Sequence, residues 1–199
     1  SIGKIEHRTK LLSDNIFGIE KQLTAQRFTL FSLSLQIFNG INPEDIKNFI
    51  ASQLEENKEI TLFGRHSFYQ NIVHANTLNT SNNFFEGLKF SYIVGTPPFF
   101  AIIDTEELQD EMSFLKNYKV DFNGHVNKFA NEIVGANQIS QCFFLIIKEW
   151  SDKHTRFGLV SNSSSFYNDH SKVFQEYFYT NYRIEKIYDL SGVKKILFE

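Results

Sequence analysis

The sequence has little that would support a disulfide-bonded, metal-binding or membrane-spanning protein. Its 199 residues include one cysteine, Cys142, which excludes a disulfide framework and a cysteine-based zinc site and fits a reducing compartment. The six histidines show no ligand spacing, so we expect no metal site. No apolar run reaches the roughly 18 residues of a membrane helix, and no apolar region follows the charged N-terminal residues. We therefore expect a cytoplasmic chain with no membrane partner.

Neither a strong excess of one charge nor a glycine-rich phosphate loop is present. The 20 basic and 23 acidic residues give a net charge of -3, which excludes a histone-like or basic-tail nucleic-acid binder. A local basic face, or DNA contacts on another domain, stays open. Without a phosphate loop, a different nucleotide-binding α/β protein is only the third candidate. The hydrophobic fraction of 42% can form a core, and the length predicts a single domain over residues 1–199.

The apolar segments alternate between strand and helix patterns. Five short segments are predicted as strands, at residues 15–20, 71–76, 90–95, 157–161 and 183–190. Helical patterns occupy residues 23–38, 43–50, 104–118, 137–150 and 170–182, while residues 120–136 are predicted to be irregular. The first of these helices is apolar around most of its circumference, which predicts that it is well buried. This order predicts an α/β fold with a doubly wound, mostly parallel, Rossmann-like sheet.

Ligands of such sheets bind at the carboxyl ends of the strands, so the residues after each strand are candidate site residues. The strand at 90–95 runs into Thr96, Pro97, Pro98 and Phe99. Two prolines donate no ladder hydrogen bond and force a rigid turn, which fixes the carbonyl groups of Thr96 and Pro97. With the aromatic ring that follows, this turn suits the binding of an exocyclic amine and the stacking of its base. The alternative is a stiff loop with a phenylalanine packed in the core.

Two further polar residues end predicted strands. Glu20 can accept two hydrogen bonds from the hydroxyls of a ribose, or it is an acid favoured by the dipole of the following helix. Asn76 can read the edge of a purine, because its amide both donates and accepts, or it forms a turn. Both pairs of alternatives stay open from the residues alone.

Four segments, in order, resemble motifs of bacterial adenine-N6 DNA methyltransferases, most of all those of type IIG restriction-modification proteins. Residues 12–20 resemble the segment around their second strand, and residues 71–78 resemble "N-I-x-x-G-D-S-L" at the third. Residues 89–99 resemble "K-F-D-x-I-I-G-N-P-P-Y/F" at the fourth strand, and residues 157–165 resemble the fifth. The order and spacing of the four segments are more specific than any one of them. The resemblance extends over residues 10–198.

This resemblance implies a chemistry and a role for each candidate residue. S-adenosyl-L-methionine would donate a methyl group to N6 of an adenine that is flipped out of double-stranded DNA. Thr96 and the Pro97 carbonyl would accept the hydrogens of the adenine amine, in the turn that Pro98 completes, and Phe99 would stack on the base. Glu20 would bind the ribose of the cofactor, and Asn76 would contact the amine of its adenine.

The sequence departs from the family pattern at positions that matter. Thr96 stands where the family has Asn or Asp, so a hydroxyl replaces a side-chain carbonyl; Asn76 replaces Asp, Ala75 replaces Gly, and Ser91 replaces Asp. The glycine-rich first motif, which binds the methionine part of the cofactor, is not found before Leu12. We therefore expect part of a longer polypeptide that lacks the first strand and is weakly active or inactive alone. The exposed sheet edge would favour self-association.

A second hypothesis belongs to another class of function. The chain would be a non-catalytic, Rossmann-like DNA-binding or scaffold module of a restriction system, working with the remaining domains of its parent protein. The degenerate motifs favour it, so the sequence leaves open whether this chain is an enzyme. The acids between residues 104 and 111 lack the arrangement of a nuclease site and are predicted to form a solvated helix face. The resemblance places the serines at 163–165 facing the target base or the DNA backbone.

Overall fold

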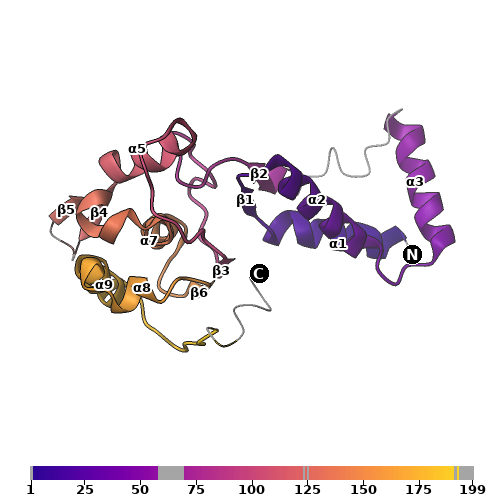
Figure 1. Ribbon diagram of the computed structural model, residues 1–199. Coiled ribbons are helices and arrows are strands. Elements are labelled where there is room, and N and C mark those ends of the chain that lie inside the picture. The colour runs from indigo at the N-terminus through magenta and orange to yellow at the C-terminus, as the bar shows by residue number, and fades with distance from the viewer. Residues whose placement is uncertain (1, 58–69, 123, 125, 191, 193–199) are drawn as a thin grey trace. The chain divides into compact units, whose positions relative to one another are not determined.

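The computed structural model describes residues 2–57, 70–122, 124, 126–190 and 192. The chain forms two compact units, Ser1–Asn79 and Thr80–Glu199. Figure 1 labels the helices and strands of both units. Within the described ranges, no helix combines the length and the apolar character that crossing a membrane requires.

In its described residues, the first unit has three helices and a short parallel sheet. Its elements are α1 (Ile2–Asn15), β1 (Gly18–Glu20), α2 (Leu23–Phe38), α3 (Pro43–Asn57) and β2 (Ile72–His74). The strands pair in parallel, with Gly18 opposite Ile72 and Glu20 opposite His74. The core is formed by Ile5, Leu30, Ile37, Ile41, Phe49 and Ile72. The strands predicted at residues 15–20 and 71–76 are both confirmed, and both are shorter than predicted.

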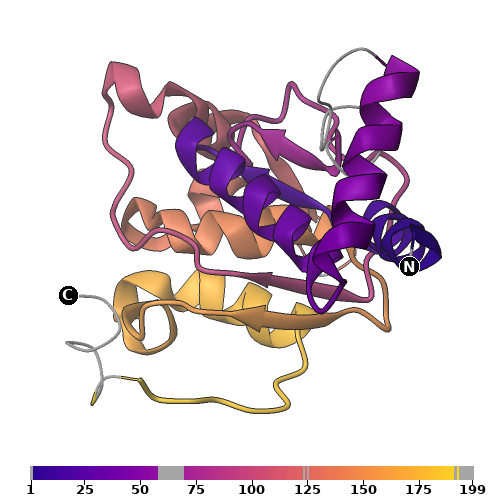
Figure 2. The same ribbon diagram turned by 90° about the vertical axis from the view of Figure 1, so that its right-hand side faces the viewer.

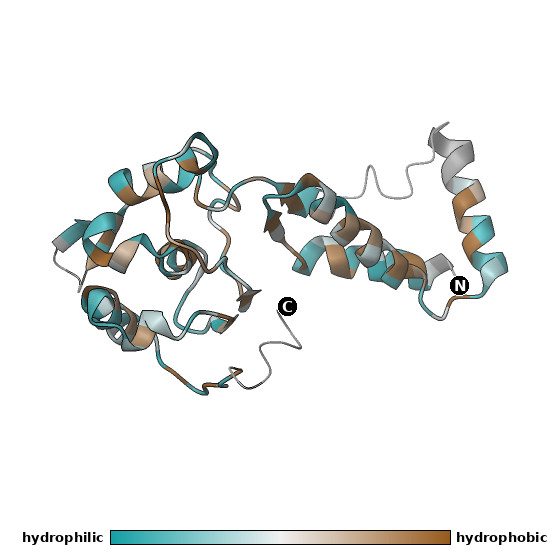
Figure 3. Ribbon diagram, viewed as in Figure 1, coloured by the Kyte–Doolittle hydropathy of each residue, from teal (hydrophilic) through white to brown (hydrophobic). Residues whose placement is uncertain are grey.

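The start of α3 shows how local sequence sets a helix end. Gly40 takes a φ of 64° after α2, a conformation that costs glycine least. Pro43 then begins α3, at a position where the backbone N–H of any residue would have no partner within the helix, so proline loses no hydrogen bond there. Glu44 and Asp45 follow at the positive end of the helix dipole. Figure 3 shows that both apolar and polar residues follow along α3.

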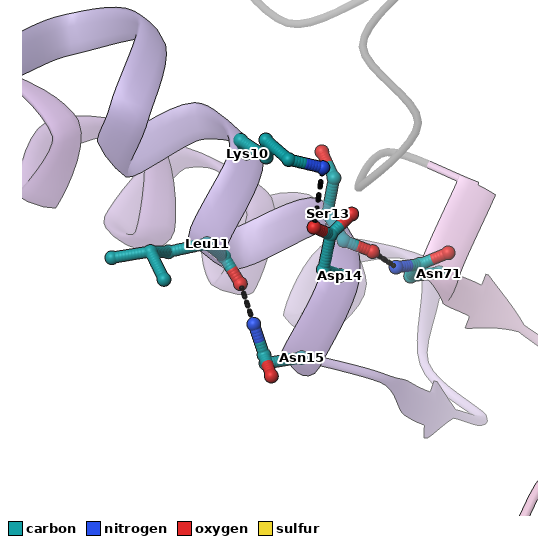
Figure 4. A network of polar contacts seen from close by, with 6 residues as sticks. All are labelled: Lys10, Leu11, Ser13, Asp14, Asn15 and Asn71. Carbon is teal, nitrogen blue, oxygen red and sulfur yellow. Dashed lines mark hydrogen bonds and ion pairs between the residues drawn. The ribbon is translucent and has the colours of Figure 1, made fainter.

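Side-chain hydrogen bonds join the helix ends of the first unit to their neighbours. Arg8 donates from Nη1 to the carbonyls of Ile37 (2.9 Å) and Asn39 (2.6 Å), where the end of α2 favours a cation. Asn71 donates from Nδ2 to the Ser13 carbonyl (2.7 Å), as Figure 4 shows. This bond fastens the start of β2 to the last turn of α1.

The helix α2 has the predicted bounds but not the predicted burial. Its buried face includes Gln26 and Leu30, whereas Phe28 on another face keeps 65% of its surface exposed. Gln26 donates from Nε2 to the Ile72 carbonyl (2.8 Å), which ties this face to β2. The prediction of a well-buried helix was wrong, because one stripe of α2 packs on α1 and the β1–β2 sheet and the rest faces outward.

The second unit combines a helical core with a parallel strand pair and an antiparallel hairpin. Its strands are β3 (Tyr92–Gly95), β4 (Lys119–Phe122), β5 (Val126–Phe129) and β6 (Arg156–Leu159). Its α-helices are α5 (Gln109–Asn117), α6 (Ala130–Ile133), α7 (Ile139–Ile146), α8 (Ser164–Tyr167) and α9 (Lys172–Asn181). Short 3-10 helices are η1 (Glu106–Leu108), η2 (Gly135–Asn137), η3 (Ile147–Trp150) and η4 (Asp169–Ser171). The apolar helix α7 is buried along most of its length.

The parallel pair of this unit joins strands that lie far apart in the sequence. Tyr92 lies opposite Arg156, and Gly95 lies opposite Leu159. Figure 2 shows β3 and β6 side by side and pointing the same way. Parallel neighbours need a long connection, and here the chain between β3 and β6 passes through helices. This is the strand–helix–strand order that the sequence predicted.

Three predictions for the second unit were wrong. Residues 120–136 are not irregular, because β4 and β5 form an antiparallel hairpin and α6 follows. Residues 183–190 form no strand within the described part of the chain, where the exposed Ile187 finds no ladder partner. Glu111 is buried, so residues 104–111 are not a purely solvated face.

The observed class is a mixed α/β fold with small parallel sheets. The described strands form three two-stranded sheets, two parallel and one antiparallel. The α/β prediction is confirmed at this level.

Candidate functional site

The pairing of β3 with β6 ends at the double proline. The amide nitrogen of Val160 donates to the Gly95 carbonyl (3.1 Å), which is the last bond of this ladder. In a parallel pair of this register, the next donor is the amide nitrogen of residue 97. Because Pro97 carries no N–H, the ladder cannot continue, and the chain leaves the sheet there.

The loop at residues 96–99 presents acceptors and an aromatic ring. Pro97 is buried, whereas Thr96, Pro98 and Phe99 are exposed. Nothing in the described part of the chain donates a hydrogen bond to the Thr96 hydroxyl or to the Pro97 carbonyl. Phe99 keeps 43% of its surface exposed, so its ring is not packed into the core as the alternative interpretation required.

The chain after this loop is fastened to the start of α7. The amide nitrogen of Ile139 donates to the Phe100 carbonyl (3.1 Å), and that of Ile102 donates to the Asn137 carbonyl (2.8 Å). The Asn137 side chain also donates to the Ile102 carbonyl (3.3 Å). Two prolines on one side and these bonds on the other leave the loop little conformational freedom.

Polar side chains gather where β6 ends. Asn162 accepts at Oδ1 from the hydroxyls of Ser140 (3.1 Å) and Ser165 (2.6 Å). Gln141, which is fully buried, donates from Nε2 to the hydroxyls of Ser171 (2.9 Å) and Ser165 (3.3 Å). Because β3 and β6 are parallel, this cluster follows the same carboxyl edge as residues 96–99.

The turn before α7 depends on a glycine. A Cβ on Gly135 would lie 2.2 Å from the carbonyl oxygen of His170, so only glycine allows η2 to approach η4 this closely. Its amide nitrogen donates to Oε1 of Gln141 (2.7 Å). Ala136 and Asn137 follow with φ values of 47° and 53°, in the left-handed region that side chains disfavour.

In the first unit, Glu20 lies at the carboxyl end of β1, as predicted. Its Oε1 accepts a hydrogen bond from the amide nitrogen of Gln22 (2.9 Å), just before α2. The backbone carbonyl of Glu20 accepts from Ala75 (3.0 Å), which extends the pairing of β1 with β2. The half-buried carboxylate therefore stands at a helix N-terminus, where the dipole favours it, and keeps further lone pairs for a ligand.

Asn76 follows β2 and takes part in a local turn. Its Oδ1 accepts from the amide nitrogen of Leu78 (3.1 Å), which is the turn-forming role that the sequence left open. Because Glu20 lies opposite His74 in the parallel pair, Asn76 lies two residues beyond it at the same edge. The structure thus brings Glu20 and Asn76 to one edge of the first unit, while residues 96–99 belong to the second unit.

The second unit has a cavity that the sequence did not predict. Its volume is about 560 Å³. Its charged and aromatic lining includes Tyr118, Lys119, Asp121, Lys148, Glu149 and Tyr177. Burial lowers the pKa of Lys148 and raises that of Tyr118, whose hydroxyl donates to Oε1 of Glu149 (2.7 Å). Two cationic and two anionic side chains balance each other, so the lining favours no class of ligand.

Other reactive side chains do not assemble into a site. Burial raises the pKa of the Cys142 thiol, so this cysteine is not poised as a nucleophile. Within the residues that the structure describes, no group of three or more His, Cys, Asp or Glu side chains could hold a metal ion.

Comparison with protein families gives one match that spans most of the chain. The model described as Eco57I restriction-modification methylase matches residues 14–197. Neither a curated protein nor a solved structure matches the chain. The matched range contains Glu20 and Asn76 at the β1–β2 edge, and it also contains the loop at residues 96–99 after β3.

Proposed function

Since the chain belongs to the Eco57I restriction-modification methylase family, we propose that it carries the base-binding residues of an S-adenosylmethionine-dependent adenine-N6 DNA methyltransferase. Family membership indicates a DNA methyltransferase; the base, the accepting atom and the cofactor are our proposal. The end of β3 supports it. There, Pro97 stops the strand ladder and leaves a hydroxyl and a carbonyl beside the exposed ring of Phe99.

In this proposal, residues 96–99 bind the flipped adenine. The amine donates one hydrogen to the Thr96 hydroxyl and the other to the Pro97 carbonyl. Because both acceptors stand on one rigid loop, they orient the nitrogen lone pair toward the methyl donor. Stacking on Phe99 contributes about 1–3 kcal/mol to holding the base. The amine nitrogen would form its bond to the methyl carbon as the bond from that carbon to the sulfonium sulfur breaks, so that S-adenosylhomocysteine would leave and the surplus proton of the nitrogen would pass to water.

We propose that the carboxyl edge of β1 and β2 binds the cofactor. S-adenosylmethionine, when bound, supplies the electrophilic methyl group. Glu20 would accept hydrogen bonds from the two ribose hydroxyls, since its carboxylate offers more lone pairs than the Gln22 amide uses. Asn76 would contact the amine of the cofactor's adenine through its carboxamide, whose oxygen also accepts from Leu78 in the local turn.

At the level of the fold, we propose that residues 1–199 belong to one catalytic domain. The β1–β2 and β3–β6 pairs would be parts of one doubly wound parallel sheet, since both are parallel and both carry proposed site residues after their carboxyl ends. An unpaired edge of these short sheets would favour self-association, or pairing with remaining domains of a parent protein. Sedimentation of the chain over a range of concentrations tests the first of these outcomes.

Two substitutions of Thr96 test the proposed function. Thr96→Val keeps the shape but removes the acceptor, and Thr96→Asn replaces it with a carbonyl that reaches further. Initial rates of methyl transfer to adenine-containing double-stranded DNA should fall at least about tenfold in the first and rise at least about tenfold in the second. Equal rates in both variants and the wild type would refute the proposed role of Thr96. A Thr96→Asn protein that binds cofactor but transfers no methyl group would refute the proposed function.

A second candidate function is a non-catalytic DNA-binding or scaffold module. The local hydrogen bonds of Glu20 and Asn76 favour it, because each side chain already has a structural role in a turn. Calorimetric titration separates the two functions. The absence of heat with S-adenosylmethionine, together with DNA binding that weakens as salt is raised, would support the scaffold.

A further inference from the structure

The loops after β3 and β6 are linked through one residue, Gln138. Its backbone forms an antiparallel bridge with Ala101, two residues after Phe99. Its side-chain Oε1 accepts a hydrogen bond from Nδ2 of Asn162 (3.0 Å), which follows β6. Both loops leave the same carboxyl edge of one parallel pair, so Gln138 spans that edge.

Asn162 is itself held in a single orientation. While its Nδ2 donates to Gln138, its Oδ1 accepts from both Ser140 and Ser165. Turning the carboxamide over would instead place Oδ1 opposite Oε1 of Gln138, where neither oxygen can donate. A half-buried amide with three hydrogen bonds of this kind fixes geometry rather than adding much net stability.

A second set of hydrogen bonds, around Gln141, holds the backbone next to Gln138 and Asn162. Gln141 is fully buried and joins Gly135, Ser165 and Ser171 through its Oε1 and Nε2. These bonds hold the strained residues of η2 just before Gln138. Strained backbone persists where surrounding contacts over-determine it, and such positions concentrate at functional sites.

We propose that Gln138 and Asn162 are positioning residues, whose side-chain hydrogen bond couples the loop at 96–99 to the loop at 161–165. The consequence for catalysis rests on the proposed function: the coupling would keep the acceptors of the amine and the serines at 163–165 in fixed relation. Misplacement of either loop by about 1 Å would slow methyl transfer by about a hundredfold.

Hydrogen–deuterium exchange of the full chain tests the coupling without activity. The amides of Ile102 and Phe166 follow the two loops and are both hydrogen-bonded. Gln138→Met removes the acceptor at similar volume, and should speed exchange at both amides about tenfold. Gln138→Glu keeps an acceptor and should restore slow exchange. Gln36→Met, at an exposed site on α2, is the matched control.

The outcomes separate the coupling from the function. Faster exchange at only one of the two amides, or equally faster exchange at Ala75 in the first unit, would overturn the coupling. If Gln138→Met changes exchange as expected but leaves kcat unaltered in an active enzyme, the positioning role is refuted. Support requires a lower kcat with an unchanged KM for S-adenosylmethionine. If the wild type and a cofactor-binding Thr96→Asn protein both transfer no methyl group, the proposed function fails, and the exchange result alone decides the coupling.

Discussion

Replacing Gly135 with alanine should destabilise the second unit by about 3 kcal/mol or more. The three nearest atoms to the added Cβ would all be backbone atoms: the carbonyl oxygen (2.2 Å) and carbon (2.8 Å) of His170 and the Cα of Ser171 (2.8 Å). No side chain can rotate away to relieve these contacts, so η2 or η4 must move. The movement would also break the bond from the Gly135 amide to Gln141 (2.7 Å), and an unpaired buried polar group costs about 1–3 kcal/mol.

Urea unfolding followed by tryptophan fluorescence measures this effect. Trp150 is the sole tryptophan and lies in the second unit, where its Nε1 donates to the Phe84 carbonyl (3.0 Å). The midpoint should fall by about 1–2 M urea. Gly95→Ala is the control, because its Cβ would make an ordinary 3.7 Å contact with the Leu159 side chain. Equal midpoints for the two variants would refute the close approach of η2 to η4.

Three further outcomes are expected. Glu20→Gln should weaken the binding of S-adenosylmethionine about tenfold in calorimetry, because an amide replaces a charged acceptor; unchanged affinity would return Glu20 to a structural role. Burial raises the pKa of Tyr118, Tyr177 and Tyr182, so the unfolded chain loses these protons first. Stability should therefore be unaffected by them below about pH 10 and fall above it, by up to about 1.4 kcal/mol per pH unit for each tyrosine, as urea titrations at rising pH would show. Phe31→Ser, on the exposed face of α2, should change stability by less than about 1 kcal/mol; a larger loss in circular dichroism melts would mean that this face is covered.

The strands at the proposed site were predictable because their signals are local. Pro97 ends the β3 ladder through its own missing N–H, whatever the rest of the chain does. Glu20 and Asn76 follow short apolar runs, and the parallel pairing of those runs places both at one edge. The burial of α2 was not local: Phe28 is apolar, but its exposure depends on which stripe of the helix finds a partner.

The hairpin was missed although the sequence carries a signal for it. Asn123 and Gly124 form an Asn-Gly pair, which is typical of tight hairpins, and Gly124 takes a φ of 77°. Val120 and Phe122 alternate with polar residues and are both buried. The ammonium group of Lys128 lies 3.9 Å from the centre of the Phe122 ring, so a polar residue contributes a cross-strand contact that hydrophobicity alone does not reveal.

The polar cluster around Gln138 could not be assembled from the sequence. Asn162 and Ser171 lie far along the chain from Gln138, and no short motif joins them. A partial signal was present, because Gln141 stands within the otherwise apolar helix α7 and a buried amide needs partners. Which partners it finds depends on the tertiary fold.

The most direct test of the proposed site is the identity of the methylated nucleoside. The chain and its Phe99→Ala variant would each be incubated with methyl-labelled S-adenosylmethionine and double-stranded DNA, and the digested DNA analysed by mass spectrometry. We predict N6-methyladenine as the labelled product, with a markedly lower yield from the variant. Labelled cytosine, or equal yields of N6-methyladenine from the two proteins, would contradict the assignment of residues 96–99 as the adenine-binding loop.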